Sequence, residues 1–296
     1  LMPELPEVET IRIGLQKKII GLKIQKIQVL SPKSFIGNPN LAEGQIILKI
    51  WRKAKILGME LSGDMTLLFH LKMSGQLVYE DEKRPALPDA SRGRFIGGHP
   101  TEDMLGTMPN SHTRVIFSFV GGSHLYFNDQ RKFGWVKVVD RLQVTGDSSI
   151  KNLGPEPLEK EFTWQILKQN LLKHKKMSVK VAIMDQSVVS GVGNIYANES
   201  CFNAKIDPRT KVGEMSDNQF KNLYSGIIEV LKAGIKYGGS TRVHFVDPEG
   251  HKGYFLDYAF VYWRDKHPCK VCGTEIKKIS LGGRGTYLCP SCQKAV

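Results

Sequence analysis

The chain lacks the marks of membrane and secreted proteins. None of its apolar runs approaches the roughly 18 residues that a helix needs to cross a bilayer. Its start contains no short apolar segment of the kind found in signal peptides. Only one cysteine, Cys201, lies outside the last 28 residues, and we expect it to be a buried core thiol. These absences exclude a membrane-spanning protein and predict a cytoplasmic one.

Negative charge is also scarce. The 296 residues include 42 lysines and arginines against 29 aspartates and glutamates, which gives a formal charge of +13. An excess of this size favours a polyanionic partner, most often nucleic acid. A basic protein without such a partner is the alternative. The length allows two domains, and 41% hydrophobic residues are enough to fill their cores.

The remaining four cysteines form two C-x-x-C pairs, 16 residues apart: Cys269, Cys272, Cys289 and Cys292. Two such pairs can bring four thiolates to the corners of a tetrahedron through two tight turns, as in structural zinc sites. Gly273 and Pro290 suit those turns. Two disulfides in a secreted protein are the alternative, disfavoured by the missing signal segment. We therefore expect one structural zinc ion.

The beginning of the chain combines prolines with acids in Pro3-Glu4-Leu5-Pro6-Glu7-Val8-Glu9. If Met2 is the initiator and is removed, Pro3 carries a secondary amine whose pKa of roughly 8 leaves part of it unprotonated at neutral pH. Such an amine can attack a sugar aldehyde carbon and form an iminium, an electron sink without a cofactor. Glu4 could act as general acid or base on the same sugar. An ordinary helix start is the alternative, compatible with the first, because prolines and acids suit a first turn.

The first half of the chain has the pattern of a β-rich domain. Apolar residues recur at helical spacing over 10–20, and strands are then expected at 22–29, 46–51, 56–61, 66–71, 115–120, 125–128 and 135–139. Residues 80–111 hold several prolines and glycines and are expected to form an extended loop. A helix beside so many strands predicts a sandwich of two sheets.

The second half, after a proline- and glycine-rich stretch at 152–158, shows helical periodicity. Helices are expected at 162–174, 177–185, 195–202 and 216–236. The stretch 186–194 between two of them favours a helix–two turns–helix layout. Backbone N–H groups at the new helix start, with the Asn194 amide, could hold a phosphate. A helical hairpin in which Asn194 is a plain N-cap is an equal alternative.

Several motifs occur in order over nearly the whole chain: 3–10, 52–55, 70–75, 129–134, 153–158, 191–200 and the cysteine pairs. Together they resemble those of the bacterial formamidopyrimidine-DNA glycosylases, which repair oxidised purines. The resemblance implies an α+β fold, with an N-terminal two-sheet β-sandwich flanked by helices. A C-terminal helical helix–two turns–helix domain with a four-cysteine zinc finger would follow.

The resemblance also implies domains and partners. The expected domains are a catalytic β-sandwich (1–145), a linker (146–158), a helical DNA-binding domain (159–240), and a lesion-capping loop region with the zinc finger (241–296). Residues 240–243 lie where the family has a loop that closes over the flipped base. The partner would be double-stranded DNA with 8-oxoguanine, formamidopyrimidines or abasic sites, bound by a monomer that carries one zinc ion.

For the chemistry, the resemblance implies a bifunctional DNA N-glycosylase and AP lyase. Pro3 would attack the deoxyribose C1′ and displace the base, leaving a Schiff base. Glu4 would protonate the ring oxygen and open the sugar. Lys55 resembles the family's essential lysine at the phosphate and sugar, although without the family a surface role is the better hypothesis. Successive β- and δ-elimination would then leave a gapped strand.

For DNA binding, the resemblance implies a wedge and a phosphate grip. A base inside a duplex must be flipped out before it can be attacked. Met73 and Phe133 would fill the gap and Arg131 would face the orphaned cytosine, as an apolar wedge and an arginine can do. On sequence alone, Met73 and Phe133 are more typical of core. Asn194 and Arg284 would hold phosphates beside the lesion.

The chain departs from the family's pattern at three places, one of them Lys72, where the family often has glycine or arginine, and two rival functions remain. Leu1 and Met2 precede Pro3, and if they are retained its nitrogen is an amide that cannot attack. The stretch 80–111 is longer than the family's usual connection. The related endonuclease VIII type prefers oxidised pyrimidines, and the 5–10 motif and the wedge residues disfavour it. A non-catalytic DNA-damage binding protein is the rival from a different class, distinguished by the residue at the mature N-terminus.

Overall fold

The computed structural model describes residues 2–81, 94–98, 106–240 and 255–294. The described residues divide into two compact units, 2–151 with 238–240 and 152–237 with 255–294. The domain boundaries expected from the sequence stay predictions. Within the described ranges, no helix combines the length and apolar character that crossing a bilayer requires.

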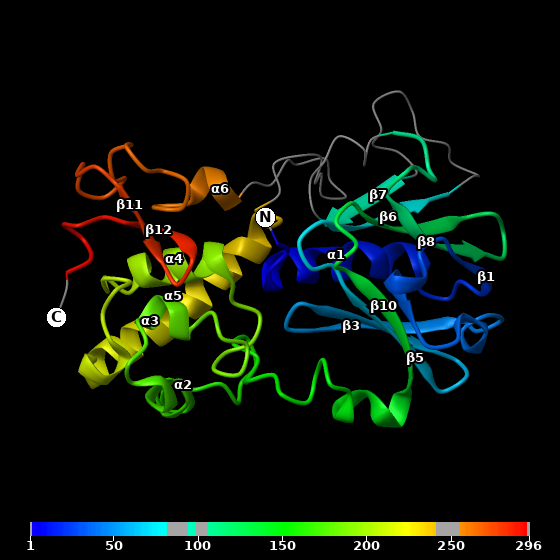
Figure 1. The fold of residues 1–296 in the computed structure, drawn as a ribbon, viewed down its shortest axis with the longest axis horizontal. Coiled ribbons are helices and arrows are strands. Elements are labelled where there is room, and N and C mark those ends of the chain that lie inside the picture. The colour runs from blue at the N-terminus through cyan, green and yellow to red at the C-terminus, as the bar shows by residue number, and fades with distance from the viewer. Residues whose placement is uncertain (1, 82–93, 99–105, 241–254, 295–296) are drawn as a thin grey trace. The chain divides into compact units, whose positions relative to one another are not determined.

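The first unit is a sandwich of two five-stranded sheets (Figure 1), as predicted. One sheet has the order β1-β8-β9-β6-β7, with strands β1 (Ile24–Val29), β6 (Gly75–Glu80), β7 (Arg94–Gly98), β8 (Thr113–Phe119) and β9 (His124–Asp129). The other has the order β2-β10-β5-β4-β3, with strands β2 (Phe35–Ile36), β3 (Ile47–Lys53), β4 (Ile56–Leu61), β5 (Met65–His70) and β10 (Trp135–Asp140). Short 3-10 turns are η1 (Pro32–Ser34), η2 (Pro39–Leu41) and η4 (Arg141–Gly146).

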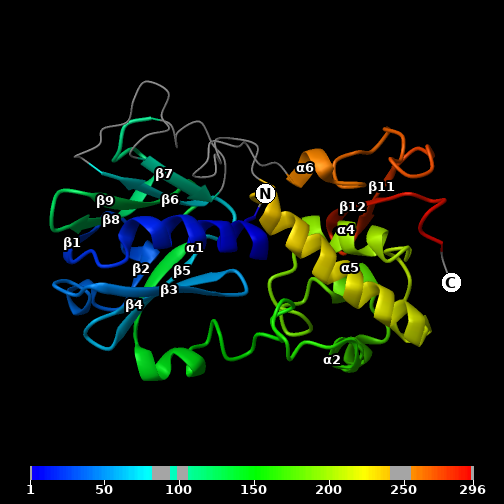
Figure 2. The same cartoon turned by 180° about the vertical axis from the view of Figure 1, so that it is seen from behind.

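Helix α1 (Leu5–Ile19) runs between the two sheets (Figures 1 and 2) and contacts β3 and β7, an edge strand of each. Its buried apolar residues join the sandwich core: Val8, Ile11, Leu15 and Ile19. Gly14 allows close approach, because a Cβ there would lie 2.0 Å from the ring of Phe95 in β7. The helix therefore fills the side of the sandwich where these two edges lie.

The stretch 80–111, expected to be a loop, contains a strand. β7 pairs antiparallel with β6 from Gln76↔Gly98 to Glu80↔Arg94. Prolines and glycines around β7 obscured it in the sequence. The edge of β6 carries backbone groups that need partners, and a five-residue segment is long enough to satisfy them. Residues 82–93 and 99–105 lie outside the described residues.

The second unit is helical and ends in a β-hairpin. Its elements are α2 (Trp164–Leu171), η5 (Leu172–His174), α3 (Val179–Ala182), α4 (Asn194–Asn203), η6 (Val212–Glu214), α5 (Asp217–Lys236), α6 (Phe255–Tyr258), β11 (Lys277–Leu281) and β12 (Arg284–Leu288). A capping box between Ser216 and Gln219 starts α5, whose predicted apolar face is buried. The helix expected at 177–185 shortens to α3, because Asp185 accepts the Ser187 N–H at 2.9 Å in a competing turn. The predicted α+β fold is confirmed.

Candidate functional site

The acidic start of the chain forms the buried beginning of α1. Glu4 is the N-cap, and its N–H donates to Oε2 of Glu7 at 2.8 Å in a capping box. Pro6 lies in the first turn, where a missing N–H costs nothing. These contacts start the helix at Leu5, whereas periodicity alone predicted residue 10. Pro3 and Glu4 are both buried beside each other at this helix start.

The other oxygen of Glu7 reaches a distant part of the same unit. Oε1 accepts the N–H of Ser240 at 2.7 Å, a contact across 233 positions. Gly239, at φ +86°, has no room for a side chain, since a Cβ would lie 2.9 Å from this oxygen. The spacing of Glu4 and Glu7 is that of a capping box, a signal for the local contact that the sequence predictions did not use, and nothing in the sequence pointed to Ser240. The rest of the predicted capping loop, 241–243, lies outside the described residues.

Lys55 lies at the tip of the β3–β4 hairpin, where it and Ala54 form the two-residue turn. Its side chain is buried, at 6% exposure, so the surface role that the sequence favoured without the family is wrong. Arg52 ties this tip to α1 by donating to the Ala54 carbonyl at 3.2 Å and to Glu9 at 3.1 Å. The turn that carries Lys55 is thereby held against α1, the helix whose N-cap is Glu4.

The Glu9 carboxylate stays ionised in this contact. Burial raises the pKa of Glu9, but hydrogen bonds from Arg12 and Arg52 and their positive charges outweigh it and hold the pKa below its ordinary value. The ion pair between Glu9 and Arg52 therefore persists at neutral pH.

His70, inside a matched motif but without a predicted role, lies beside Lys55. It pairs with Ile56 across β4 and β5, and its Nδ1 accepts the N–H of Lys72 at 3.0 Å. The neutral ring therefore carries its proton on Nε2. Desolvation, followed by the charges of Lys72 and Lys55, lowers the pKa of His70 to about 3. A neutral N–H donor beside lysines is suited to hydrogen-bonding an anion.

The three predicted wedge residues come together because two crossovers run side by side. Residues 71–74 connect β5 to β6 and residues 130–134 connect β9 to β10, each passing from one sheet to the other. Since β5 pairs with β10 and β6 with β9, the crossovers are neighbours. The Arg131 guanidinium lies 4.8 Å from the Phe133 ring centroid, and its Nη1 lies 3.2 Å from Sδ of Met73. Phe133 is 54% exposed, so the core position expected from sequence alone is wrong.

Asn194 opens α4, but Gly193 is the N-cap, so the plain N-cap hypothesis is wrong. The Asn194 side chain accepts from Nζ of Lys180 at 2.5 Å and donates to the carbonyl of Gly285 at 3.2 Å. Lys180 is completely buried, which the sequence analysis missed. The available signal was a lysine between apolar neighbours in a short helix. A buried ammonium thus sets the direction of the Asn194 amide.

The β11–β12 hairpin carries Arg284 next to this amide. Gly282 and Gly283 form its two-residue turn with φ of +59° and +69°, which only glycine adopts readily. Arg284 follows directly and is exposed. A second contact joins the hairpin to α4, since Oδ1 of Asn198 accepts the Tyr287 N–H at 2.7 Å. The two predicted phosphate-binding residues therefore lie on adjoining elements of one unit.

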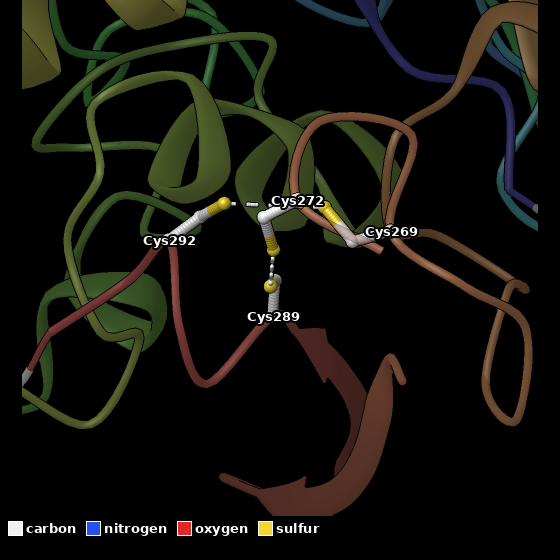
Figure 3. A group of neighbouring side chains, drawn as sticks. All are labelled: Cys269, Cys272, Cys289 and Cys292. Carbon is white, nitrogen blue, oxygen red and sulfur yellow. Dashed lines mark hydrogen bonds between the residues drawn. The ribbon is translucent and has the colours of Figure 1, made fainter. Parts of the chain in front are cut away.

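The four paired cysteines converge beside the hairpin (Figure 3), with their sulfurs all within 4.8 Å of one another. Sγ of Cys269 lies 3.9 Å from that of Cys292, and Sγ of Cys272 lies 3.4 Å from that of Cys289. Tetrahedral zinc–thiolate bonds place sulfurs about 3.8 Å apart. Gly273 makes the expected turn at φ +75°. The donor set and spacing fit one zinc ion.

Three family models match the chain in order. The formamidopyrimidine-DNA glycosylase N-terminal domain matches residues 2–136, the H2TH domain of the same enzyme matches 153–245, and the zinc finger found in FPG and IleRS matches 266–295. Formamidopyrimidine-DNA glycosylase of Pelotomaculum thermopropionicum is 38% identical, with 99% of each chain covered. The enzyme of Listeria monocytogenes is 36% identical over 99% of this chain and 100% of its own.

The chain belongs to the formamidopyrimidine-DNA glycosylase family. Solved structures agree with this assignment. Lactococcus lactis Fpg in complex with DNA containing an abasic site has a TM-score of 0.83 at 30% identity, covering 98% of this chain and 99% of its own. MutM (Fpg) from Thermus thermophilus has a TM-score of 0.81 at 32% identity, covering 99% and 100%.

Membership in the formamidopyrimidine-DNA glycosylase family confirms the predicted resemblance. The chain is an enzyme of a DNA glycosylase/AP lyase family that acts in base-excision repair of oxidised purines. Its zinc finger and four-cysteine site confirm the predicted zinc ion. The full-length relatives named here carry the predicted family name rather than that of endonuclease VIII.

Proposed function

We propose that this chain excises 8-oxoguanine and formamidopyrimidines from duplex DNA through a Schiff base on Pro3, and then cleaves the abasic site by β,δ-elimination. The observation that carries the proposal is the buried Pro3–Glu4 start of α1 in a member of a glycosylase/lyase family. Two similar structures, a mutant of Lactococcus lactis Fpg bound to Fapy-dG DNA and MutM bound to carbocyclic 8-oxo-G DNA, support these substrates.

The proposed chemistry requires a free amine on Pro3. Its nitrogen bonds to C1′ as the glycosidic bond breaks and the electron pair leaves with the base. Glu4 gives a proton to the ring oxygen, which opens the sugar to an iminium. Loss of the C2′ proton expels the 3′ phosphate, and a second elimination expels the 5′ phosphate. Lys55, buried at its hairpin tip, holds the phosphate and sugar in place for these steps.

DNA contact is assigned to the wedge and to the second unit. Met73 and Phe133 fill the gap left by the flipped base, and Arg131 faces the orphaned cytosine. Asn194 and Arg284 hold phosphates beside the lesion, supported by their position on adjoining elements. The protein acts as a monomer on duplex DNA in the bacterial cytoplasm.

Borohydride trapping tests this function. A chain that begins at Pro3, mixed with a duplex carrying 8-oxoguanine opposite cytosine, should give a permanent protein–DNA adduct that peptide mapping places on Pro3. A chain that retains Leu1 and Met2 is the matched control and should give none, because its Pro3 nitrogen is an amide. Glu4→Gln should keep DNA binding and lose base release. An equal adduct on the extended chain would mean that another amine, a lysine or the Leu1 α-amine, is the nucleophile, and it would refute the Pro3 assignment.

A further inference from the structure

The two crossovers that carry the wedge share one buried carboxylate. Asp129, the last residue of β9, has no exposed surface. Its Oδ2 accepts the Gly134 N–H at 2.6 Å, and its Oδ1 accepts the Arg131 N–H at 3.2 Å, both from the 130–134 crossover. Oδ1 also accepts the hydroxyl of Ser74 from the 71–74 crossover. One buried carboxylate therefore holds the backbone of the 130–134 crossover and the Ser74 side chain of the 71–74 crossover.

Ser74 completes the link between the crossovers. Its hydroxyl donates to Asp129 and accepts the Arg131 N–H at 3.0 Å, and the residue is only 4% exposed. Hydrogen bonds to a buried charge are stronger than those between neutral groups. Ser74, which follows Met73, and the backbone of Arg131 are therefore both positioned by the Asp129 carboxylate.

Both crossovers hold a strained residue beside the wedge. Lys72, next to Met73, has φ +51°, and Lys132, between Arg131 and Phe133, has φ +57°. Residues other than glycine adopt this left-handed conformation when their surroundings fix it. The wedge geometry is consequently imposed by contacts rather than by local preference.

We propose that Asp129, acting with Ser74, is a positioning residue that sets Met73, Arg131 and Phe133 for insertion into the duplex. It controls base eversion and the choice of the opposite base without touching DNA. This inference rests on the proposed function. An amide is a poor substitute for the carboxylate, because its NH2 group would face the N–H of Gly134 or Arg131 whichever way it is turned.

Asp129→Asn and Ser74→Ala in the full chain test the proposal. Two rates are measured under single turnover: excision of 8-oxoguanine opposite cytosine in a duplex, and cleavage of a single-stranded abasic oligonucleotide, which has no opposite base. For Asp129→Asn the ratio of the first rate to the second should fall about tenfold, the effect of one lost hydrogen bond to a buried charge. Preference for cytosine over adenine opposite the lesion should fall with it. Ser74→Ala, a smaller change that keeps the charge, should move both quantities in the same direction.

Asp147→Asn and Ser149→Ala are the matched controls. Asp147 in the same unit accepts the Ser149 hydroxyl at 2.6 Å, but it lies beyond the opposite end of β10 from the wedge. Both controls should keep the wild-type ratio. Equal losses on both substrates, or unchanged opposite-base preference in both test variants, would overturn the positioning role. Failure of the wild-type chain to excise 8-oxoguanine would instead overturn the proposed function, and the inference with it.

Discussion

His70 is uncharged in the folded protein at neutral pH, and the charges of two nearby lysines favour this neutral state. Desolvation lowers its pKa, and the charges of Lys72 and Lys55 lower it further, to about 3 from an ordinary 6.5. The Lys72 N–H occupies Nδ1, so the ring offers its Nε2–H as a donor. Positive charge at this place therefore comes from lysine alone, and it does not change as pH falls toward 5.

Imidazole NMR should show this directly. In protein with labelled histidine, the His70 signals, assigned by their loss in His70→Gln, should keep the neutral Nε2–H form from pH 8 to 5. Between pH 6.5 and 3 the unfolded chain binds a proton at His70 and the folded chain does not. The free energy of unfolding therefore falls as pH falls through this window, by at most about 1.4 kcal/mol per pH unit. The His70→Gln variant should show a smaller fall over the same window. A His70 signal that titrates near pH 6.5 would contradict the assignment.

Elements differ in how far their residues alone predicted them. Helix α5 has a capping box and one apolar face, and the finger has fixed C-x-x-C spacing, so local rules were sufficient. Strand β7 escaped prediction because its stability comes from the edge of β6, not from its own residues. The burial of Lys55, the contact of Glu7 with Ser240, and the carboxylate of Asp129 under two crossovers depend on residues far apart in the chain. Motif spacing in the sequence predicted the candidate site residues. The partners that support them became visible only in the folded structure.

The four zinc-finger cysteines and the buried Cys201 should differ in their reactivity toward a thiol reagent. Removing zinc with a chelator should release one ion per chain and expose four thiols to a disulfide reagent, because structural zinc holds such small units together. Cys201 should remain unreactive, since burial raises its pKa to about 12. Cys201→Ala is the control and should keep both the zinc content and the four thiols that react after zinc removal. Cys289→Ser should lose zinc and DNA binding. Five reactive thiols in the native protein would contradict this division.

Across the whole molecule, the proposed function gives charge and shape separate tasks in DNA binding. The formal charge of +13 attracts any duplex and releases counterions from its phosphates. In the proposed function, damage-specific action depends on the wedge and on the start of α1, both of which are supported by buried hydrogen bonds. Nonspecific affinity should therefore change with salt, whereas the preference for a lesion should change with the wedge.

The phosphate grip offers a paired test of that separation. Arg284→Ala removes one exposed charge and should flatten the salt dependence of duplex binding by about 0.9 units of slope, for damaged and undamaged DNA alike. Asn194→Ala removes a neutral amide, held by Lys180, and should lower affinity by a similar factor at every salt concentration. Lys277→Ala on the same hairpin is the control, since its ammonium already pairs with Glu275 at 2.7 Å, and it should leave the slope near that of wild type. Fluorescence-anisotropy titrations at salt concentrations of about 50 to 300 mM would measure these slopes and affinities. Parallel lines for Arg284→Ala and wild type would refute Arg284 as a phosphate contact, because a lost ion contact must appear in the slope.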